Sequence, residues 1–230
     1  SPKAIIDAYG VTILVTVIGT FFSLLFTSML AYVLARKDFK LGRVFSFMVF
    51  FAMLFNGGLV STYIMMVQYY HLKDTLFALI IPYLIMPWHI FLMKGLLSDI
   101  PTSLIDAAKI DGAGEVKTFF RIILPISKPA MATVGLFIAF TYWNDWYQSM
   151  LYIDDASLSS LQYYLYRIMN NIQYLSSSMM SGSVSIDMAS LPSETARMAL
   201  CLLAAGPMLV IFPFFQKYFV KGITVGAVKG

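Results

Sequence analysis

Five long apolar stretches, separated by shorter polar segments, set the pattern of the chain. Each stretch is long enough to cross about 30 Å of hydrocarbon, which takes roughly 20 helical residues. The pattern therefore predicts an all-α, polytopic membrane helix bundle, with residues 1–230 forming a single transmembrane domain. The five predicted spans are residues 10–35, 44–68, 75–97, 128–152 and 197–219.

The composition agrees with this pattern and excludes an ordinary soluble domain. Hydrophobic residues make up 59% of the chain, charged residues only 12%, and the mean hydropathy is +0.77. A soluble domain is typically about 25% charged. The single cysteine excludes an intrachain disulfide. In a membrane protein the net charge of +4 informs topology rather than nucleic-acid binding.

The basic residues indicate which loops face the cytoplasm. Twelve of the 16 lie after the first span, after the third span or in the C-terminal tail: Arg36, Lys37, Lys40, Arg43, Lys94, Lys109, Lys117, Arg121, Lys128, Lys217, Lys221 and Lys229. The positive-inside rule then predicts a cytoplasmic C-terminus and an outside N-terminus. Because residues 1–9 carry no signal peptide, we expect a further helix before them, giving six native spans.

The loop at residues 98–125 is polar and predicted to form two short helices at an angle. Ser103 and Asp106 have the spacing of a capping box, and Pro101 suits a first helical turn. Gly112 is expected to end the first helix. An amphipathic second piece follows and leads to Pro125. A compact knob of this kind suits docking to a soluble protein.

The same loop carries a recognisable motif. Ala107 and Ala108, then Gly112 after three residues, then Ile122-x-Leu124-Pro125 after nine more, resemble the EAA loop of binding-protein-dependent ABC importers. Asp106 stands where that motif has Glu. The tail, residues 215–222 and 226–230, is similar to the C-termini of the carbohydrate group. The chain thus resembles an inner-membrane permease subunit of carbohydrate ABC importers.

This resemblance implies a function and a set of partners. The chain would move a sugar, expected to be an oligosaccharide, across the bacterial cytoplasmic (inner) membrane by alternating access. It would bind no cofactor, because ATP and Mg would bind to two cytoplasmic ATPase subunits. A second homologous permease and an extracytoplasmic solute-binding protein would complete the transporter. The implied ATPase-coupling residues are Asp106, Ala107, Ala108, Asp111, Gly112 and Ala113.

Polar groups within the spans are candidates for the substrate pathway, since such groups usually face a cavity or another helix. Asn56, Gly57 and Gly58 lie near the middle of the second span. Paired glycines can unwind a helix, as in transporters, or allow close helix packing. The sequence leaves both interpretations open.

The fourth span holds the second candidate group: Trp143, Asn144, Asp145 and Gln148. Aromatic faces stack on sugar C–H surfaces, while amides and carboxylates bind sugar hydroxyls. An outer aromatic belt would explain the rings but not the embedded acid. We therefore predict that this group lines the substrate pathway.

Three further features are predicted around these groups. Pro82 and Pro87 should kink the third span, where His89 is expected to be a packing residue. Residues 158–175 have helical apolar spacing and predict an amphipathic helix on the outer surface. Residues 176–190, rich in Ser, Met and Gly, predict a loop.

Other function classes fit less well. The main alternative, an ion-coupled secondary transporter or channel subunit, would require paired charges within the membrane. The sequence offers only one strongly embedded acid, Asp145. A membrane enzyme would need a metal-ligand cluster or a nucleophile with its base, and the sequence shows neither. Gly112 to Thr118 is not a P-loop, because Val116 precedes Lys117 where Gly is required.

Overall fold

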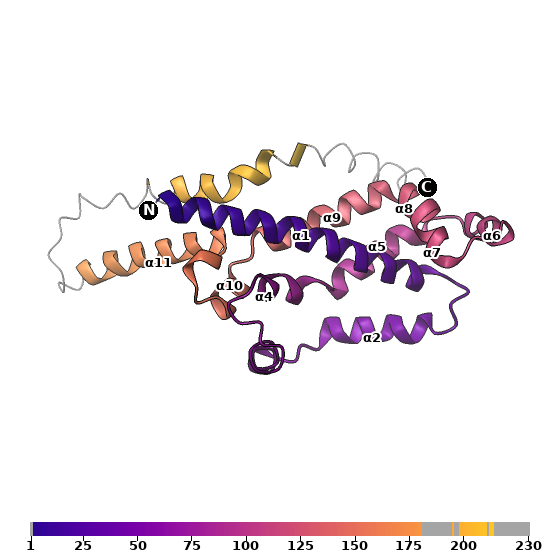
Figure 1. Cartoon of the computed structure of the whole chain (residues 1–230), viewed down its shortest axis with the longest axis horizontal. Helices are drawn as coiled ribbons and strands as arrows, with labels where there is room; N and C mark the ends of the chain where they lie inside the picture. The colour runs from indigo at the N-terminus through magenta and orange to yellow at the C-terminus, as the bar shows by residue number, and fades with distance from the viewer. Residues whose placement is uncertain (1, 181–194, 196–197, 211, 214–230) are drawn as a thin grey trace.

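The computed structural model describes residues 2–180, 195, 198–210 and 212–213 and is an elongated helix bundle (Figure 1). Every regular element over residues 2–180 is helical, as predicted. The elements are α1 (Pro2–Ala35), α2 (Gly42–Leu54), α3 (Leu59–Ile64), π-helix η1 (Met65–Tyr69), α4 (Leu76–Ile80), 3₁₀-helix η2 (Ile81–Tyr83), α5 (Pro87–Ser98), α6 (Thr102–Ile110), α7 (Glu115–Thr118), π-helix η3 (Phe119–Ile123), α8 (Leu124–Ile126), α9 (Lys128–Trp143), α10 (Tyr147–Tyr152), 3₁₀-helix η4 (Ala156–Leu158) and α11 (Leu161–Met180).

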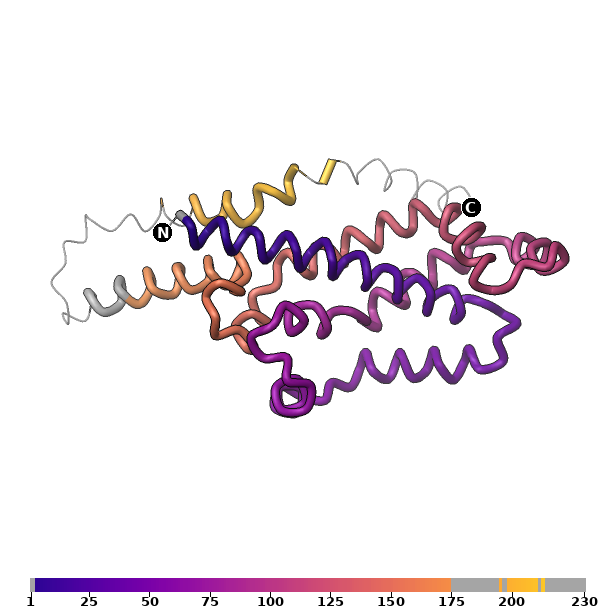
Figure 2. The backbone as a smooth tube through the Cα atoms, in the orientation of Figure 1, coloured from indigo at the N-terminus to yellow at the C-terminus, as the bar shows by residue number. Residues whose placement is uncertain are grey.

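Helix α1 is the central element of the bundle. It runs beside α5 and α9 over most of its length (Figure 2). Its buried side chains, among them Ala31 and Tyr32, join Met93 of α5 and Ile138 of α9 in the main hydrophobic core. Helices α6 and α7 lie at one end of the bundle and α11 at the other (Figure 1).

The predicted spans are less regular than continuous helices. Only α1 is by itself long and apolar enough to cross a membrane among the described helices, and up to four segments qualify if each bent pair counts as one span. The span predicted over 44–68 is broken, because α2 and the following helix meet at 106°. The fourth predicted span ends early as an α-helix, since α9 stops at Trp143 and α10 begins at Tyr147.

The bend in the second segment follows from its glycines. Gly58 has φ +87°, a conformation that favours glycine. The Asn56 side chain accepts a hydrogen bond from the Gly58 N–H at 3.0 Å, and the Thr62 hydroxyl donates to the Gly58 carbonyl at 2.8 Å. These polar contacts stabilise the break. Of the two interpretations left open by the sequence, the unwound helix is the one observed.

The third span bends where the prolines predicted it. The segments Leu76–Tyr83 and Pro87–Ser98 meet at 50°. Met86, before Pro87, has an extended backbone, the conformation that a following proline favours. His89 is buried and lies 5.3 Å from the Trp88 ring, edge to face, so its packing role is confirmed. Its Nδ1 has no hydrogen-bond partner within the described chain.

The outer segments are partly as predicted. The amphipathic helix expected over 158–175 is present as α11, with Leu161 and Leu165 buried. The predicted loop 176–190 is wrong over its first residues, because α11 continues to Met180; the rest of it lies outside the described residues. Of the fifth predicted span, the described part contains an apolar helix over Met198–Val210.

Candidate functional site

The site at the α6 end of the bundle is built by a helix, a sharp elbow and a second helix. Helix α6 begins at Thr102, directly after Pro101, and no side chain caps its N-terminus, so the capping box predicted from Ser103 is wrong. It ends at Ile110, and Gly112 follows with φ +73°. The Ala113 N–H donates to the Ala108 carbonyl at 2.9 Å and closes the last turn. Gly112 thus ends the helix as predicted.

The second helix of the site anchors the elbow in the bundle. Helix α7 continues into the π-helix η3, where Phe119 and Ile123 are buried in the main core. The opposite face carries exposed apolar side chains, with Val116 and Phe120 accessible to solvent. Ile110 at the end of α6 is the extreme case, with 86% of its surface exposed. We call residues 102–123 the coupling knob.

Most of the predicted ATPase-coupling residues lie on the outer surface of the coupling knob. Asp106, Ala107, Asp111 and Gly112 are exposed, and Ala113 is half-buried. Ala108 is the exception, because only 4% of its surface is exposed. Its methyl group therefore packs inward, and the small residue there allows the helix to approach the bundle.

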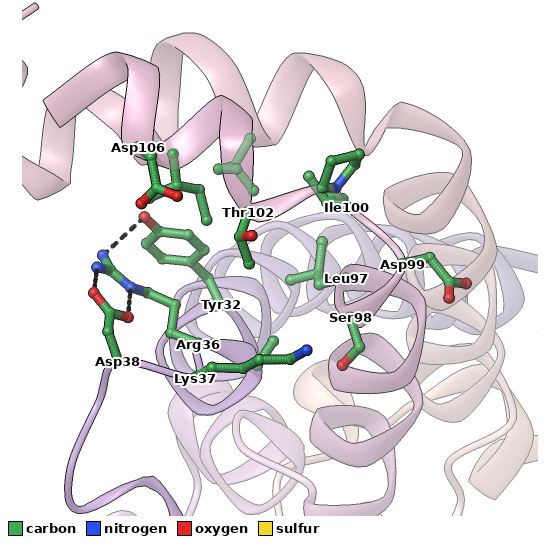
Figure 3. A pocket seen from close by; sticks show the side chains of 14 residues that line it. Tyr32, Arg36, Lys37, Asp38, Leu97, Ser98, Asp99, Ile100, Thr102 and Asp106 are labelled. Atoms are coloured by element: carbon green, nitrogen blue, oxygen red, sulfur yellow. Dashed lines mark hydrogen bonds and ion pairs between the residues drawn. The ribbon is translucent and has the colours of Figure 1, made fainter. Parts of the chain in front are cut away.

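A cluster of charges that sequence reasoning did not single out joins the coupling knob to the end of α1. Figure 3 shows its members Tyr32, Arg36 and Asp38. Arg36 pairs with Asp38 through two hydrogen bonds, one of them Nε to Oδ1 at 2.8 Å, and also pairs with Glu115. Lys109 Nζ lies 2.7 Å from Asp38 Oδ2. The Tyr32 hydroxyl donates to Glu115 at 3.2 Å. Three of these residues come from the segment around the end of α1, and two come from the knob.

These contacts hold the Asp38 carboxylate in its charged form. Hydrogen bonds from the Arg36 guanidinium and the Lys109 ammonium lower the pKa of Asp38 well below its usual range. The Arg36 guanidinium also lies 5.7 Å from the centre of the Tyr32 ring, within cation–π range. From the sequence, Arg36 and Lys109 indicated only which loops are cytoplasmic, because nothing in their spacing predicts that they lie close together.

An open cavity of about 640 Å³ lies between this cluster, the end of α5 and the start of α6. Figure 3 shows the side chains that line it. Tyr32 and Arg36 line one side, and Ser98, Thr102 and Asp106 come from the segments opposite. Asp106, the leading acid of the EAA-like motif, thus lines this cavity and is also exposed to solvent.

The candidate substrate residues occupy different environments. Trp143 is 2% exposed, and its indole N–H donates to the Ala204 carbonyl at 2.9 Å. Asn144 is exposed, and its amide donates to the Phe140 carbonyl at 2.9 Å. Trp143 therefore joins α9 to the Met198–Val210 helix, and Asn144 turns outward at the end of α9.

Asp145 lies in the break between α9 and α10, Gln148 lies in the first turn of α10, and both are buried. The Asp145 carboxylate accepts hydrogen bonds from the Tyr83 hydroxyl at 3.0 Å and from the Gln148 N–H at 3.3 Å. Within the described residues, no hydrogen bond joins this group to Asn56, Gly57 or Gly58, which are exposed. Tyr83 is a hydrogen-bond partner of Asp145 that sequence reasoning missed.

Comparison with known proteins gives a consistent result. The family model described as "Binding-protein-dependent transport system inner membrane component" matches residues 8–225. Protein LplC of Bacillus subtilis (strain 168) is 37% identical over 230 residues, covering 100% of this chain and 76% of LplC. The polygalacturonan/rhamnogalacturonan transport system permease protein YtcP of the same strain is 40% identical over 223 residues, covering 96% of this chain and 76% of YtcP.

A solved structure agrees with these relatives. A crystal structure of a bacterial ABC transporter involved in the import of the acidic polysaccharide alginate matches with a TM-score of 0.79 and 28% identity, over 94% of this chain and 76% of that chain. The overall fold of this chain is therefore similar to that of a chain of a known ABC transporter. By sequence and by structure, this chain belongs to the family of binding-protein-dependent transport system inner membrane components.

Proposed function

We propose that this chain is the permease subunit of an ATP-driven importer for an oligosaccharide, and that its coupling knob docks to a cytoplasmic ATPase subunit. The observation that carries the proposal is the exposed surface of the knob. A protein in water rarely leaves a side chain such as Ile110 almost fully exposed beside further apolar groups without a partner. Asp106, Ala107 and Gly112 lie on this accessible surface.

The energy for transport comes from the partner subunits in this proposal. Two ATPase subunits bind ATP and Mg, and their closure moves the coupling knob. A second homologous permease forms the other half of the pathway, and an extracytoplasmic solute-binding protein delivers the sugar. This orientation puts the knob and the C-terminus in the cytoplasm, in agreement with the placement of the basic residues.

The sugar class is supported by the named relatives. YtcP is named for polygalacturonan and rhamnogalacturonan transport, and the structural relative for alginate import. We place the pathway at the two helix breaks, with Asn56, Gly57 and Gly58 at one, and with Asn144, Asp145 and the adjoining Gln148 of α10 at the other. Trp143 supports the second break from within the core, through its hydrogen bond to Ala204.

The test is co-purification of the ATPase with the tagged permease from membranes. Gly112→Asp is the informative variant, because a Cβ at Gly112 meets nothing within 4 Å and Asp tolerates a positive φ. The variant therefore adds a charge to the docking surface without a clash, and its backbone cost at a positive φ is smaller than for most other residues. Ala107→Asp likewise adds a negative charge to the docking surface, at an exposed position of α6.

Gly112→Asn and Lys40→Asp are the matched controls. The first keeps the size of the Gly112→Asp side chain without its charge, and the second adds negative charge on an exposed residue outside the knob. We expect the ATPase to co-purify with the wild type and with Lys40→Asp, and to co-purify in a smaller amount with Gly112→Asn. It should be lost from Gly112→Asp and Ala107→Asp. Retention of the ATPase by both of those variants would refute docking through the knob.

A further inference from the structure

The five residues Tyr32, Arg36, Asp38, Lys109 and Glu115 form one connected charged cluster, which we call the charged joint. Its centre is Arg36, whose side chain is only 10% exposed, whereas its carboxylate partners are more than half exposed. Arg36 bonds to both carboxylates and to the Tyr32 hydroxyl, the last at 3.3 Å. An arginine is suited to this position because its planar fork can bond several oxygens at once.

The joint attaches both sides of the elbow to the same point. Lys109 lies in the last turn of α6, and Glu115 lies in the first turn of α7. The elbow between them contains Gly112, which adopts a positive φ of +73°. Both helices are tied to the end of α1, Lys109 through Asp38 and Glu115 through Arg36. The joint therefore restricts bending at the elbow.

Tyr32 is the one member of the joint that also packs in the main core; the four charged members are not part of it. Helix α1 is held by the main core with α5 and α9, and the joint lies at its exposed end. Exposed ion pairs contribute little to stability individually. Loss of the charged contacts should thus leave the fold intact and loosen the polar tie between the knob and α1, while the apolar contact between Phe119 and the Tyr32 ring remains.

We propose that the charged joint transmits motion of the coupling knob to α1, with Arg36 as its positioning residue. This inference rests on the proposed docking of an ATPase to the knob and deepens it. When the ATPase displaces the knob, the joint makes α1 follow, and α1 carries the displacement along the bundle to α5 and α9. Without Arg36, ATPase closure would be absorbed at the Gly112 elbow.

The experiment uses the complete transporter, reconstituted in vesicles with its ATPases and binding protein. Two quantities are measured: the ATPase bound per permease, and the sugar imported per ATP hydrolysed. Arg36→Gln is compared with Arg43→Gln, an exposed arginine of the neighbouring segment outside the joint. Arg36→Lys, which keeps the charge but not the fork, is the conservative variant.

We expect Arg36→Gln to bind the ATPase normally and to import less sugar per ATP by about fivefold or more, the lower end of usual coupling between sites. Arg43→Gln should match the wild type, and Arg36→Lys should fall between them. An unchanged ratio of sugar to ATP in Arg36→Gln would overturn the proposal. Loss of ATPase binding in Arg36→Gln would also overturn it, because Arg36 would then act in docking.

A second pair of variants covers the case in which Arg36→Gln does not fold. Asp38→Asn and Lys109→Gln alter exposed members of the joint, and Lys40→Gln is the matched control on an exposed lysine outside both the joint and the knob. We expect both joint variants, but not the control, to lower the ratio, and unchanged ratios in both would refute transmission through the joint. Failure of the wild type to bind any ATPase would refute the docking function itself.

Discussion

The crossing of α1 and α9 at Gly19 offers the sharpest test of the packing. A Cβ at Gly19 would lie 2.6–2.8 Å from three atoms of the Tyr142 ring. The ring has no room to yield, because Tyr142 is 2% exposed and its hydroxyl donates to the Ile80 carbonyl at 2.9 Å. Gly19→Ala should therefore force the two helices apart or break this hydrogen bond.

The magnitude follows from opposing contributions. Ordinary carbon contacts lie at about 3.5–4.0 Å, so the new methyl group would be roughly 0.8 Å or more too close. Such overpacking costs about 1–3 kcal/mol, and loss of the Tyr142 hydrogen bond adds about 1 kcal/mol. Alanine in place of glycine within a helix returns about 0.8–1.0 kcal/mol. The sum predicts a loss of roughly 1–3 kcal/mol of folding free energy.

Thermal unfolding of the membrane-reconstituted permease measures this loss, and Gly10→Ala is the matched control. Gly10 lies in the same helix, but a Cβ there meets nothing within 4 Å. We expect Gly10→Ala to match or exceed the wild-type midpoint, and Gly19→Ala to fall below it. Tyr142→Leu should relieve the clash in the double variant. Equal midpoints for Gly10→Ala and Gly19→Ala would refute the close approach of the two helices.

Two further predictions concern the break in the second span and a loop contact. Gly58→Ala should slow transport and lower stability by about 1–3 kcal/mol, because φ +87° is strained for alanine. Gly57→Ala should have a mild effect, because its Cβ would lie 3.6 Å from Ser61 Oγ, an ordinary contact distance. Equal uptake rates and thermal midpoints for the two variants would contradict the strain argument. The Asp74 carboxylate accepts hydrogen bonds from the N–H groups of Asp155 and Asp154 at 2.9 and 2.6 Å, which lowers the pKa of Asp74. The stabilisation by the Asp74 carboxylate should thus be complete above the unfolded-state pKa of about 3.9 and be lost as the pH falls further. The difference in thermal midpoint between the wild type and Asp74→Ala should therefore shrink below that pH. A difference that stays constant with pH would exclude the charged carboxylate as the source of the stabilisation.

The sequence predicted the helical class and the EAA-like knob because both depend on local pattern. Apolar length determines which segments enter lipid, and Gly112 ends α6 through its own backbone freedom. The continuity of the spans was not predictable in the same way. The 106° bend at Gly58 is accompanied by hydrogen bonds between Gly58 and the side chains of Asn56 and Thr62, which the sequence permits but does not require.

The site shows the same division between local and long-range information. Asp106, Ala107 and Gly112 were identified from motif spacing, and their exposure agrees with a docking surface. The charged joint was not identified, because Arg36 and Glu115 are 79 residues apart in sequence. Likewise, Tyr83 could not be linked to Asp145 from sequence, since their contact arises only when the broken third and fourth segments pack together.

The placement of breaks and ties suggests how motion would travel through the molecule. The second, third and fourth spans each contain an interruption, and a bent segment can absorb a displacement locally. Helix α1 contains no interruption from Pro2 to Ala35, and its end is the point to which the charged joint ties the coupling knob. A displacement of the knob that reaches Arg36 is therefore passed along a rigid helix, whereas one that enters through η3 meets an 85° bend before α9. Of the two routes from the knob into the bundle, the one through Arg36 and α1 is the stiffer, and we expect it to dominate coupling.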